Sequence, residues 1–189
     1  PIGYAYEEVP EFTAQDYTGR VQKLWNMEQA SKYDAIVIYG DREHFSSIHY
    51  FTGYDPRWEE SLLILKRNAR PVLLVGNEGM GYVAGLKSEV EVQMYQTFSL
   101  MGQPNDNRSK KLDEIFRECG IGEETRVGLI GWKVYRQELF ELSSLVTDVP
   151  HYIVETLAGI TGIDKIKNAA DLLGDCEYGL KHQVSAKEI

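Results

Sequence analysis

The stretch SLLILKRNARPVLLV, residues 61–75, decides the fold. It contains two mainly apolar runs, 61–65 and 71–75, which are joined by the mostly polar turn Arg-Asn-Ala-Arg, residues 67–70. Two short apolar runs around a polar turn are typical of a β-hairpin, whose strands pair antiparallel. A sheet that contains this hairpin therefore has at least one antiparallel pair of strands.

The rest of the chain places further strands and helices around the hairpin. The segment DAIVIY, residues 34–39, carries a continuous apolar run that ends at Gly40-Asp41, as in a strand buried on both faces. Further strands are predicted at 89–95, 126–130 and 152–155, and helices at 13–32, 43–52, 82–87, 109–119, 135–145 and over most of the tail from residue 163. This alternation predicts an α/β domain with a mixed, about six-stranded sheet and helices on both faces.

The charge balance bears on the possible partners. The chain has 20 basic and 29 acidic residues, for a formal charge of −9. Nucleic acids and anionic membranes attract clustered Lys and Arg, so neither is expected as a partner. The longest apolar runs, 35–38 and 62–65, are much shorter than the roughly 18 to 20 residues of a membrane-spanning helix. With no recognisable signal peptide, and with Cys119 and Cys176 read as free thiols, we expect a cytoplasmic protein.

The two ends of the sequence suggest a piece of a longer protein. The chain begins with Pro1 rather than Met. Residues 185–189 favour a helix and contain no Gly or Pro that would end one. We expect residues 1–179 to form one domain and residues 180–189 to begin a helix that leads into another domain.

A glycine-rich loop offers one candidate for cofactor binding. Gly79, Gly81 and Ala84 match the spacing Gly-x-Gly-x-x-Ala, in which glycines let a pyrophosphate approach the N-terminus of a helix. Three residues separate the preceding strand from Gly79, Glu78 would place a negative charge beside the phosphates, and the strand belongs to a hairpin. An ordinary glycine loop is the favoured interpretation.

Metal binding and the common hydrolytic motifs find little support. His44 and His49 are five residues apart, so on a helix they point in different directions, unlike the i, i+4 pair of a helical metal site. The sequence contains no Gly-x-Ser-x-Gly elbow, Walker loop or Cys-x-x-Cys. We expect no catalytic, cofactor-binding or metal-binding residue in this chain.

The most distinctive segment is SIHYFTGYDPRWEE, residues 47–60. Gly53 allows a positive φ, and Pro56 stiffens the residues that follow it. Asp55, Arg57 and Trp58 would then lie on a stiff loop suited to contact with a ligand or another subunit, where Arg and Trp are frequent anchors. The alternative is that Trp58 packs into the core and Arg57 pairs with a nearby acid.

Residues 48–54, IHYFTGY, resemble a stretch in the N-terminal domain of Xaa-Pro aminopeptidases, prolidases and creatinases. The order of neighbours also fits, because a strand like 34–39 precedes this stretch and a hairpin like 62–65 with 71–75 follows it. Residues 180–189 are similar to the opening of the first helix of that family's catalytic domain. Two departures stand out: Ser47 replaces the family's Asn, and His49 replaces its Arg.

The resemblance implies a domain that performs no chemistry itself. In such enzymes a catalytic "pita-bread" domain follows and holds two divalent metal ions, of the Mn, Zn or Co type, with two Asp, one His and two Glu, to activate water for amide hydrolysis. The N-terminal domain helps to build a dimer, and its loop roofs the active site of a partner subunit. Carried onto this sequence, the loop positions are Tyr54, Asp55, Arg57 and Trp58.

The resulting hypothesis is a non-catalytic N-terminal domain of an Xaa-Pro peptidase-like metallohydrolase, with its own C-terminal catalytic domain and a second subunit as partners. It would serve dimerisation and gating of the active site. Two alternatives remain: a free-standing nucleotide-binding α/β enzyme that uses Gly79, Gly81 and Ala84, and a stand-alone interaction module.

Overall fold

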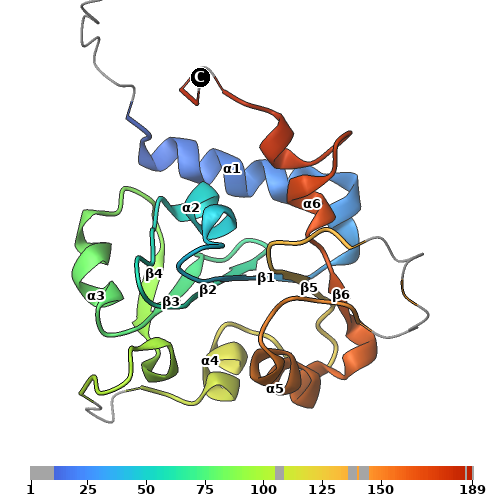
Figure 1. Cartoon of the computed structure of the whole chain (residues 1–189). Coiled ribbons are helices and arrows are strands. Elements are labelled where there is room, and N and C mark those ends of the chain that lie inside the picture. The colour runs from blue at the N-terminus through green and yellow to red at the C-terminus, as the bar shows by residue number, and fades with distance from the viewer. Residues whose placement is uncertain (1–10, 105–108, 136–139, 141–144, 186, 189) are drawn as a thin grey trace, which may run out of the picture.

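A computed structural model describes residues 11–104, 109–135, 140, 145–185, 187 and 188. Its centre is a six-stranded sheet in the order β4-β3-β2-β1-β5-β6 (Figure 1). The strands are β1 (Ala35–Gly40), β2 (Ser61–Lys66), β3 (Val72–Val75), β4 (Glu91–Met94), β5 (Val127–Ile130) and β6 (Ile166–Asn168).

The sheet is mixed, as the hairpin predicts. Strand β2 pairs antiparallel with both β1 and β3, whereas β3–β4, β1–β5 and β5–β6 are parallel pairs. All six residues of β1 are buried, which confirms the prediction of a strand covered on both faces.

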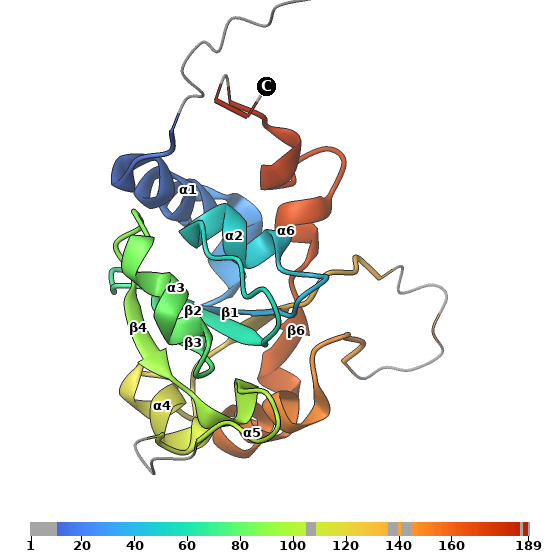
Figure 2. The ribbon, with the colours of Figure 1, turned by 60° about the vertical axis from the view of Figure 1, so that its left-hand side comes forward.

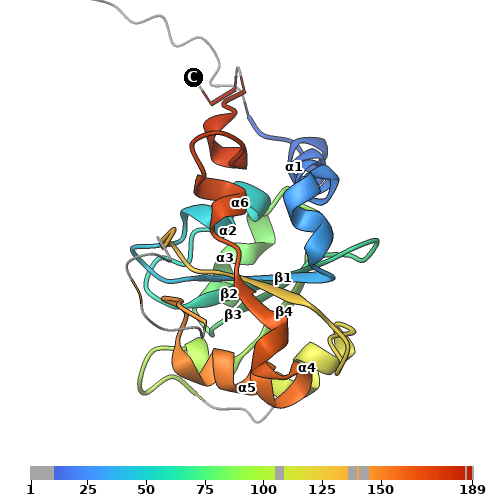
Figure 3. The same ribbon diagram turned by 90° about the vertical axis from the view of Figure 1, so that its right-hand side faces the viewer.

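Helices cover both faces of the sheet. Figure 3 shows α1 (Ala14–Asn26), α2 (Ser46–Thr52) and α6 (Asp171–Gly174) on one side, with α4 (Leu112–Glu118) and α5 (His151–Thr161) on the other. Each side has its own apolar core against the sheet. The short helix α3 (Gly79–Tyr82) lies beside β4 (Figure 2). Short 3₁₀ turns occur at Glu28–Lys32, Val83–Gly85, Gln96–Phe98, Ile163–Lys165 and Leu180–His182.

The sixth strand is not where the sequence pattern places it. Residues 152–155 lie inside α5, so the prediction of a strand there is wrong. Ile153, Leu157 and Ile160 recur at helical spacing and are all buried. Burial of this apolar stripe favours the helix more than the β-branched residues favour a strand. The strand is instead β6, in the tail that was expected to be mainly helical. The helix predicted at 135–145 falls mostly on residues outside the described ones.

Helix α1 begins and ends for identifiable reasons. The Asp16 carboxylate accepts a hydrogen bond from the Thr13 N–H at 2.7 Å, which is part of a capping box at the start of the helix. The α-helix ends at Asn26 rather than near residue 32, because Met27 is extended and the chain continues as a 3₁₀ turn.

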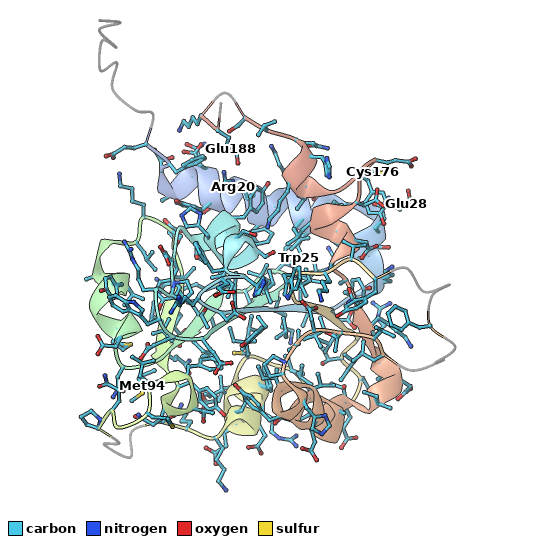
Figure 4. The ribbon with its side chains drawn as sticks, in the orientation of Figure 1. Arg20, Trp25, Glu28, Met94, Cys176 and Glu188 are labelled. Atoms are coloured by element: carbon cyan, nitrogen blue, oxygen red, sulfur yellow. The ribbon has the colours of Figure 1, made fainter. Side chains whose placement is uncertain are left out.

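One buried guanidinium joins α1 to two other segments. Arg20, only 9% exposed, lies between the rings of Phe12 and Tyr50, with its Cζ 4.3 Å from each ring centroid. It donates hydrogen bonds to the Tyr50 carbonyl and to the Glu188 carboxylate, both at 2.6 Å. Figure 4 shows Arg20 on α1 with Glu188 close by. Lys187 pairs with Asp16 at 2.6 Å, so residues 187 and 188 are held beside the start of α1.

Replacing Arg20 with methionine (Arg20→Met) should lower the free energy of unfolding by about 2–4 kcal/mol, because the Glu188 carboxylate and the Tyr50 carbonyl would lose their hydrogen-bond donor. Urea unfolding followed by circular dichroism measures this loss. Lys23→Met, at an exposed position of the same helix, is the matched control and should change stability by less than about 0.5 kcal/mol. Equal effects of the two substitutions would show that Arg20 does not hold these segments together.

Candidate functional site

The loop between α2 and β2, residues 53–60, contains the four residues expected to contact a ligand or another subunit, Tyr54, Asp55, Arg57 and Trp58. Gly53 ends α2 with φ of 73°, which confirms the expected positive φ. A Cβ at this position would lie 2.5 Å from the Tyr17 hydroxyl, so a larger residue would have to displace the Tyr17 side chain between α2 and α1. The direction in which the loop leaves α2 is therefore fixed by packing.

Arg57 and Asp55 form a small local structure at the tip of the loop. The Arg57 N–H donates to the Asp55 carboxylate at 2.9 Å, and the Arg57 Nε lies 3.6 Å from the other carboxylate oxygen. Arg57 has φ of 60°, a left-handed backbone that costs a non-glycine residue roughly 1–2 kcal/mol. Its side chain is 58% exposed. Arg57 thus pairs with a nearby acid, and it also remains available for contacts outside the chain.

Trp58 is not part of the core, although one interpretation of the sequence placed it there. It is 52% exposed and meets the ring of Tyr82 edge-on, with centroids 6.1 Å apart. Tyr82, on α3, is 43% exposed. We call Trp58 and Tyr82 the aromatic patch. Large apolar side chains gathered on a surface are typical of a site of contact with another molecule.

Tyr54 has a different place from the other predicted residues. It is 1% exposed, and its hydroxyl lies against Gly79, where any Cβ would clash with it. The hydroxyl has no hydrogen-bond partner among the described residues. Burial, followed by the negative charges of Glu59 and Asp55, raises the pKa of this hydroxyl well above its ordinary value. Tyr54 can support the loop from below, but it does not reach the surface as the resemblance suggested.

Glu59 is the residue of this loop that sequence reasoning missed. Read from sequence, Glu59-Glu60 is an acidic pair of the kind found in solvated turns, yet Glu59 is only 2% exposed. Its carboxylate accepts hydrogen bonds from the backbone N–H groups of Glu78 at 3.0 Å and Gly79 at 2.8 Å. Glu59 therefore attaches the loop to the start of α3 and holds the aromatic patch together.

The same contact weakens the nucleotide-binding alternative. Strands β3 and β4 are parallel and α3 lies between them, so the Gly79 loop does belong to a βαβ unit, contrary to the objection drawn from the hairpin. However, the Glu59 carboxylate occupies the N–H groups of Glu78 and Gly79. A phosphate placed there would meet a buried negative charge instead of free donors.

His44, one of the histidines considered as a metal ligand, has an aromatic and an acidic neighbour. His44 stacks on Trp132, with centroids 4.3 Å apart, and its Nδ1 lies 3.1 Å from the Asp41 carboxylate. Within the described part of the chain, no group of three or more His, Cys, Asp or Glu side chains is arranged to hold a metal ion. None of the described helices is both long and apolar enough to cross a membrane.

Comparison with known proteins places this architecture among solved structures. No protein-family model and no curated protein sequence matches the chain. A dipeptidase PepE from Mycobacterium ulcerans superposes with a TM-score of 0.56 at 12% identity, over 89% of this chain and 38% of that one. The prolidase from Pyrococcus horikoshii gives 0.51 at 15% identity, over 82% of this chain and 33% of that one.

A third structure is a separate domain. The creatinase/prolidase N-terminal domain of an X-Pro dipeptidase from Streptococcus pyogenes gives a TM-score of 0.50 at 13% identity, over 80% of this chain and 93% of that domain. The chain thus spans about a third of the full-length enzymes, 33% and 38% of them, and nearly all of the isolated domain. Its fold is that of a creatinase/prolidase N-terminal domain.

Proposed function

We propose that this chain is the non-catalytic N-terminal domain of an Xaa-Pro peptidase-like metallohydrolase. The observation that carries the proposal is the match in extent: the chain corresponds to 93% of an isolated N-terminal domain but to 33% of a whole prolidase. Residues 1–179 would form this domain, and residues 180–189 would lead into the catalytic one. Two divalent metal ions of the Mn, Zn or Co type would belong to that following domain, where they would activate water.

The proposed role of the loop is contact with a second subunit and restriction of access to its active site. Three features support it. The aromatic patch is exposed, the loop is fixed from below by Glu59 and Tyr54, and Arg57 retains a strained backbone. Rigid positioning lowers the entropy lost on association, so these residues suit an interface. Asp55, Arg57 and Trp58 would make the contacts, while Tyr54 would support them.

The purified chain should fold, form dimers and cleave no Xaa-Pro dipeptide in the presence of Mn²⁺, Zn²⁺ or Co²⁺. Release of proline, followed over a range of enzyme concentrations, measures cleavage. The protein extended by the coding sequence beyond Ile189 should cleave such dipeptides, with metal dependence. Cleavage by the 189-residue chain itself would contradict the proposal.

In the extended protein, replacing Trp58 with serine (Trp58→Ser) should change KM for bulky substrates more than kcat, because the proposed role is access rather than chemistry. Steady-state kinetics with a small and a bulky Xaa-Pro substrate measures this difference. An equal fall in kcat for both substrates, with KM unchanged, would speak against gating.

Replacing Arg57 with glycine (Arg57→Gly) should separate stability from association. Relief of the left-handed strain should leave the free energy of unfolding unchanged or raise it by up to about 1 kcal/mol. Self-association, measured by sedimentation equilibrium, should weaken at least about tenfold through loss of an interface anchor.

The matched control is Asn68→Gly, since Asn68 has a similar φ of 57° in the turn between β2 and β3. This variant should gain stability in the same way without weakening self-association. A wild-type chain that stays monomeric at high concentration would rule out the dimer part of the proposal.

Replacing Glu59 with glutamine (Glu59→Gln) should lower the free energy of unfolding by about 1–3 kcal/mol. The two backbone N–H groups bind the two charged carboxylate oxygens, whereas an amide has a single, uncharged acceptor oxygen. The substitution should also increase the hydrogen exchange of the Glu78 and Gly79 amides. Glu155→Gln, whose side chain is 74% exposed, is the control and should do neither. Unchanged exchange at Glu78 and Gly79 would show that Glu59 does not fix the loop.

A further inference from the structure

A groove of about 1030 Å³ lies between α1 and the turn that joins β2 to β3. Figure 3 shows α1 lying over the end of the sheet at which this turn projects. The groove does not include Asp55, Arg57 or Trp58, and nothing in the function proposed above makes use of it. Its volume is at the upper end of the roughly 300–1,000 Å³ of typical ligand sites.

The floor of the groove is apolar. Tyr17, Val21 and Trp25 recur every four residues along one stripe of α1 and line it. Phe51 and Val90, both buried, complete the floor from α2 and from the residue just before β4. A stripe of this kind can take up apolar side chains of a bound chain.

One wall carries uncharged hydrogen-bonding groups. Thr18, Gln22 and Asn26 form the next stripe of α1, also spaced by four residues, and all three are exposed. Among the hydrogen bonds between described residues, none involves the side chain of any of the three. A row of free amides and a hydroxyl along a groove suits the N–H and C=O groups of a peptide backbone.

The other wall is basic. Arg67 and Arg70 line it, against a single lining carboxylate, that of Glu89. The ammonium of the neighbouring Lys66 is turned away from the groove and donates to the Gly120 carbonyl. Arg67 donates to the carbonyls of Trp25 at 2.9 Å and Ala30 at 3.0 Å and stacks on the Trp25 ring at 4.6 Å. Arg67 is therefore held in place along the groove.

Arg70 is held less firmly, by one hydrogen bond of 3.1 Å to the Val90 carbonyl. No carboxylate among the described residues forms an ion pair with Arg67 or Arg70. In a chain with a formal charge of −9, two cations without an ion-pair partner form a local field of the opposite sign.

We propose that this groove binds an extended acidic peptide with apolar side chains, supplied by a partner protein. The amide-bearing wall would bind its backbone, the basic wall its carboxylates, and the floor its apolar side chains. From Tyr17 to Trp25 the helix rises about 12 Å, at roughly 1.5 Å per residue. That length matches about four residues of extended chain at roughly 3.3 Å each.

The two walls distinguish a peptide from other anionic ligands. Gln22 and Asn26 on one side and Arg70 on the other are exposed, so the groove opens to solvent between them, whereas small-molecule sites enclose most of the ligand. A general polyanion would use the cations but neither the apolar floor nor the amide row. Alternating apolar and acidic side chains on a free backbone use all three surfaces.

The test is fluorescence anisotropy with a fluorescein-labelled peptide of alternating glutamate and leucine. We expect micromolar affinity that falls with added salt, and no binding of the corresponding lysine–leucine peptide. Arg70→Glu should weaken binding at least about tenfold, because it reverses an exposed charge on the basic wall. Gln22→Ala combined with Asn26→Ala should weaken it about as much, through lost backbone contacts.

Arg42→Glu is the matched control, since it makes the same charge change at an exposed position. Arg42 follows the end of β1 opposite the β2–β3 turn, because β1 ends beside Ser61 and starts beside Lys66. It should leave binding unchanged. An equal effect of Arg42→Glu and Arg70→Glu, displacement of the peptide by a sulfated polysaccharide at equal charge, or no binding at millimolar peptide would each overturn the proposal.

Discussion

Strand β1 is the constraint on which the rest of the structure depends. Its six residues are all buried, and it pairs with β2 on one side and β5 on the other. A strand hidden on both faces requires a helical layer above and below the sheet, and the two separate apolar cores meet that need. The parallel pairing with β5 further requires a long crossover, whereas β2 follows after α2 and one loop. That loop carries the candidate site, so the site's position at the end of β1 follows from the same constraint.

The sequence predicted those parts of the fold in which local pattern and tertiary position agree. The runs at 34–39, 61–65, 71–75 and 126–130 are strands within one or two residues, because each is short, apolar and bounded by polar residues or glycine. Strand β6 was missed because only Ile166 of its three residues is apolar, so nothing local distinguishes it from a loop. It is a strand because β5 offers it a free edge, which is a property of the assembled sheet. Residues 152–155 show the opposite case. Their local preference for a strand was overridden by the apolar stripe that runs along the eleven residues of helix α5.

The sequence indicated which loop carries the candidate site, but not which contacts hold that loop in place. The density of aromatic residues, Gly53, Pro56 and Arg57 indicated the loop, and Gly53 behaves as expected. The roles of Tyr54 and Glu59 depend on Gly79, which lies 20 residues beyond Glu59 and 25 beyond Tyr54. No pattern within the loop reports a contact at that separation. A carboxylate that looks solvated in the sequence is buried because the first N–H groups of α3 need an acceptor.

The contacts of Arg20 with Glu188 and of Lys187 with Asp16 bring the first and last described residues to the same place on the molecule. The Lys187 ammonium also donates to the Glu11 carbonyl at 3.4 Å. A folded unit whose two ends lie close together can be inserted into another polypeptide at a single point, and the connecting segments do not cross its core. Residues 11–188 therefore have the geometry of a module that could be spliced into a surface turn of an unrelated host protein, with the sheet intact and with only a few residues of spacer on each side.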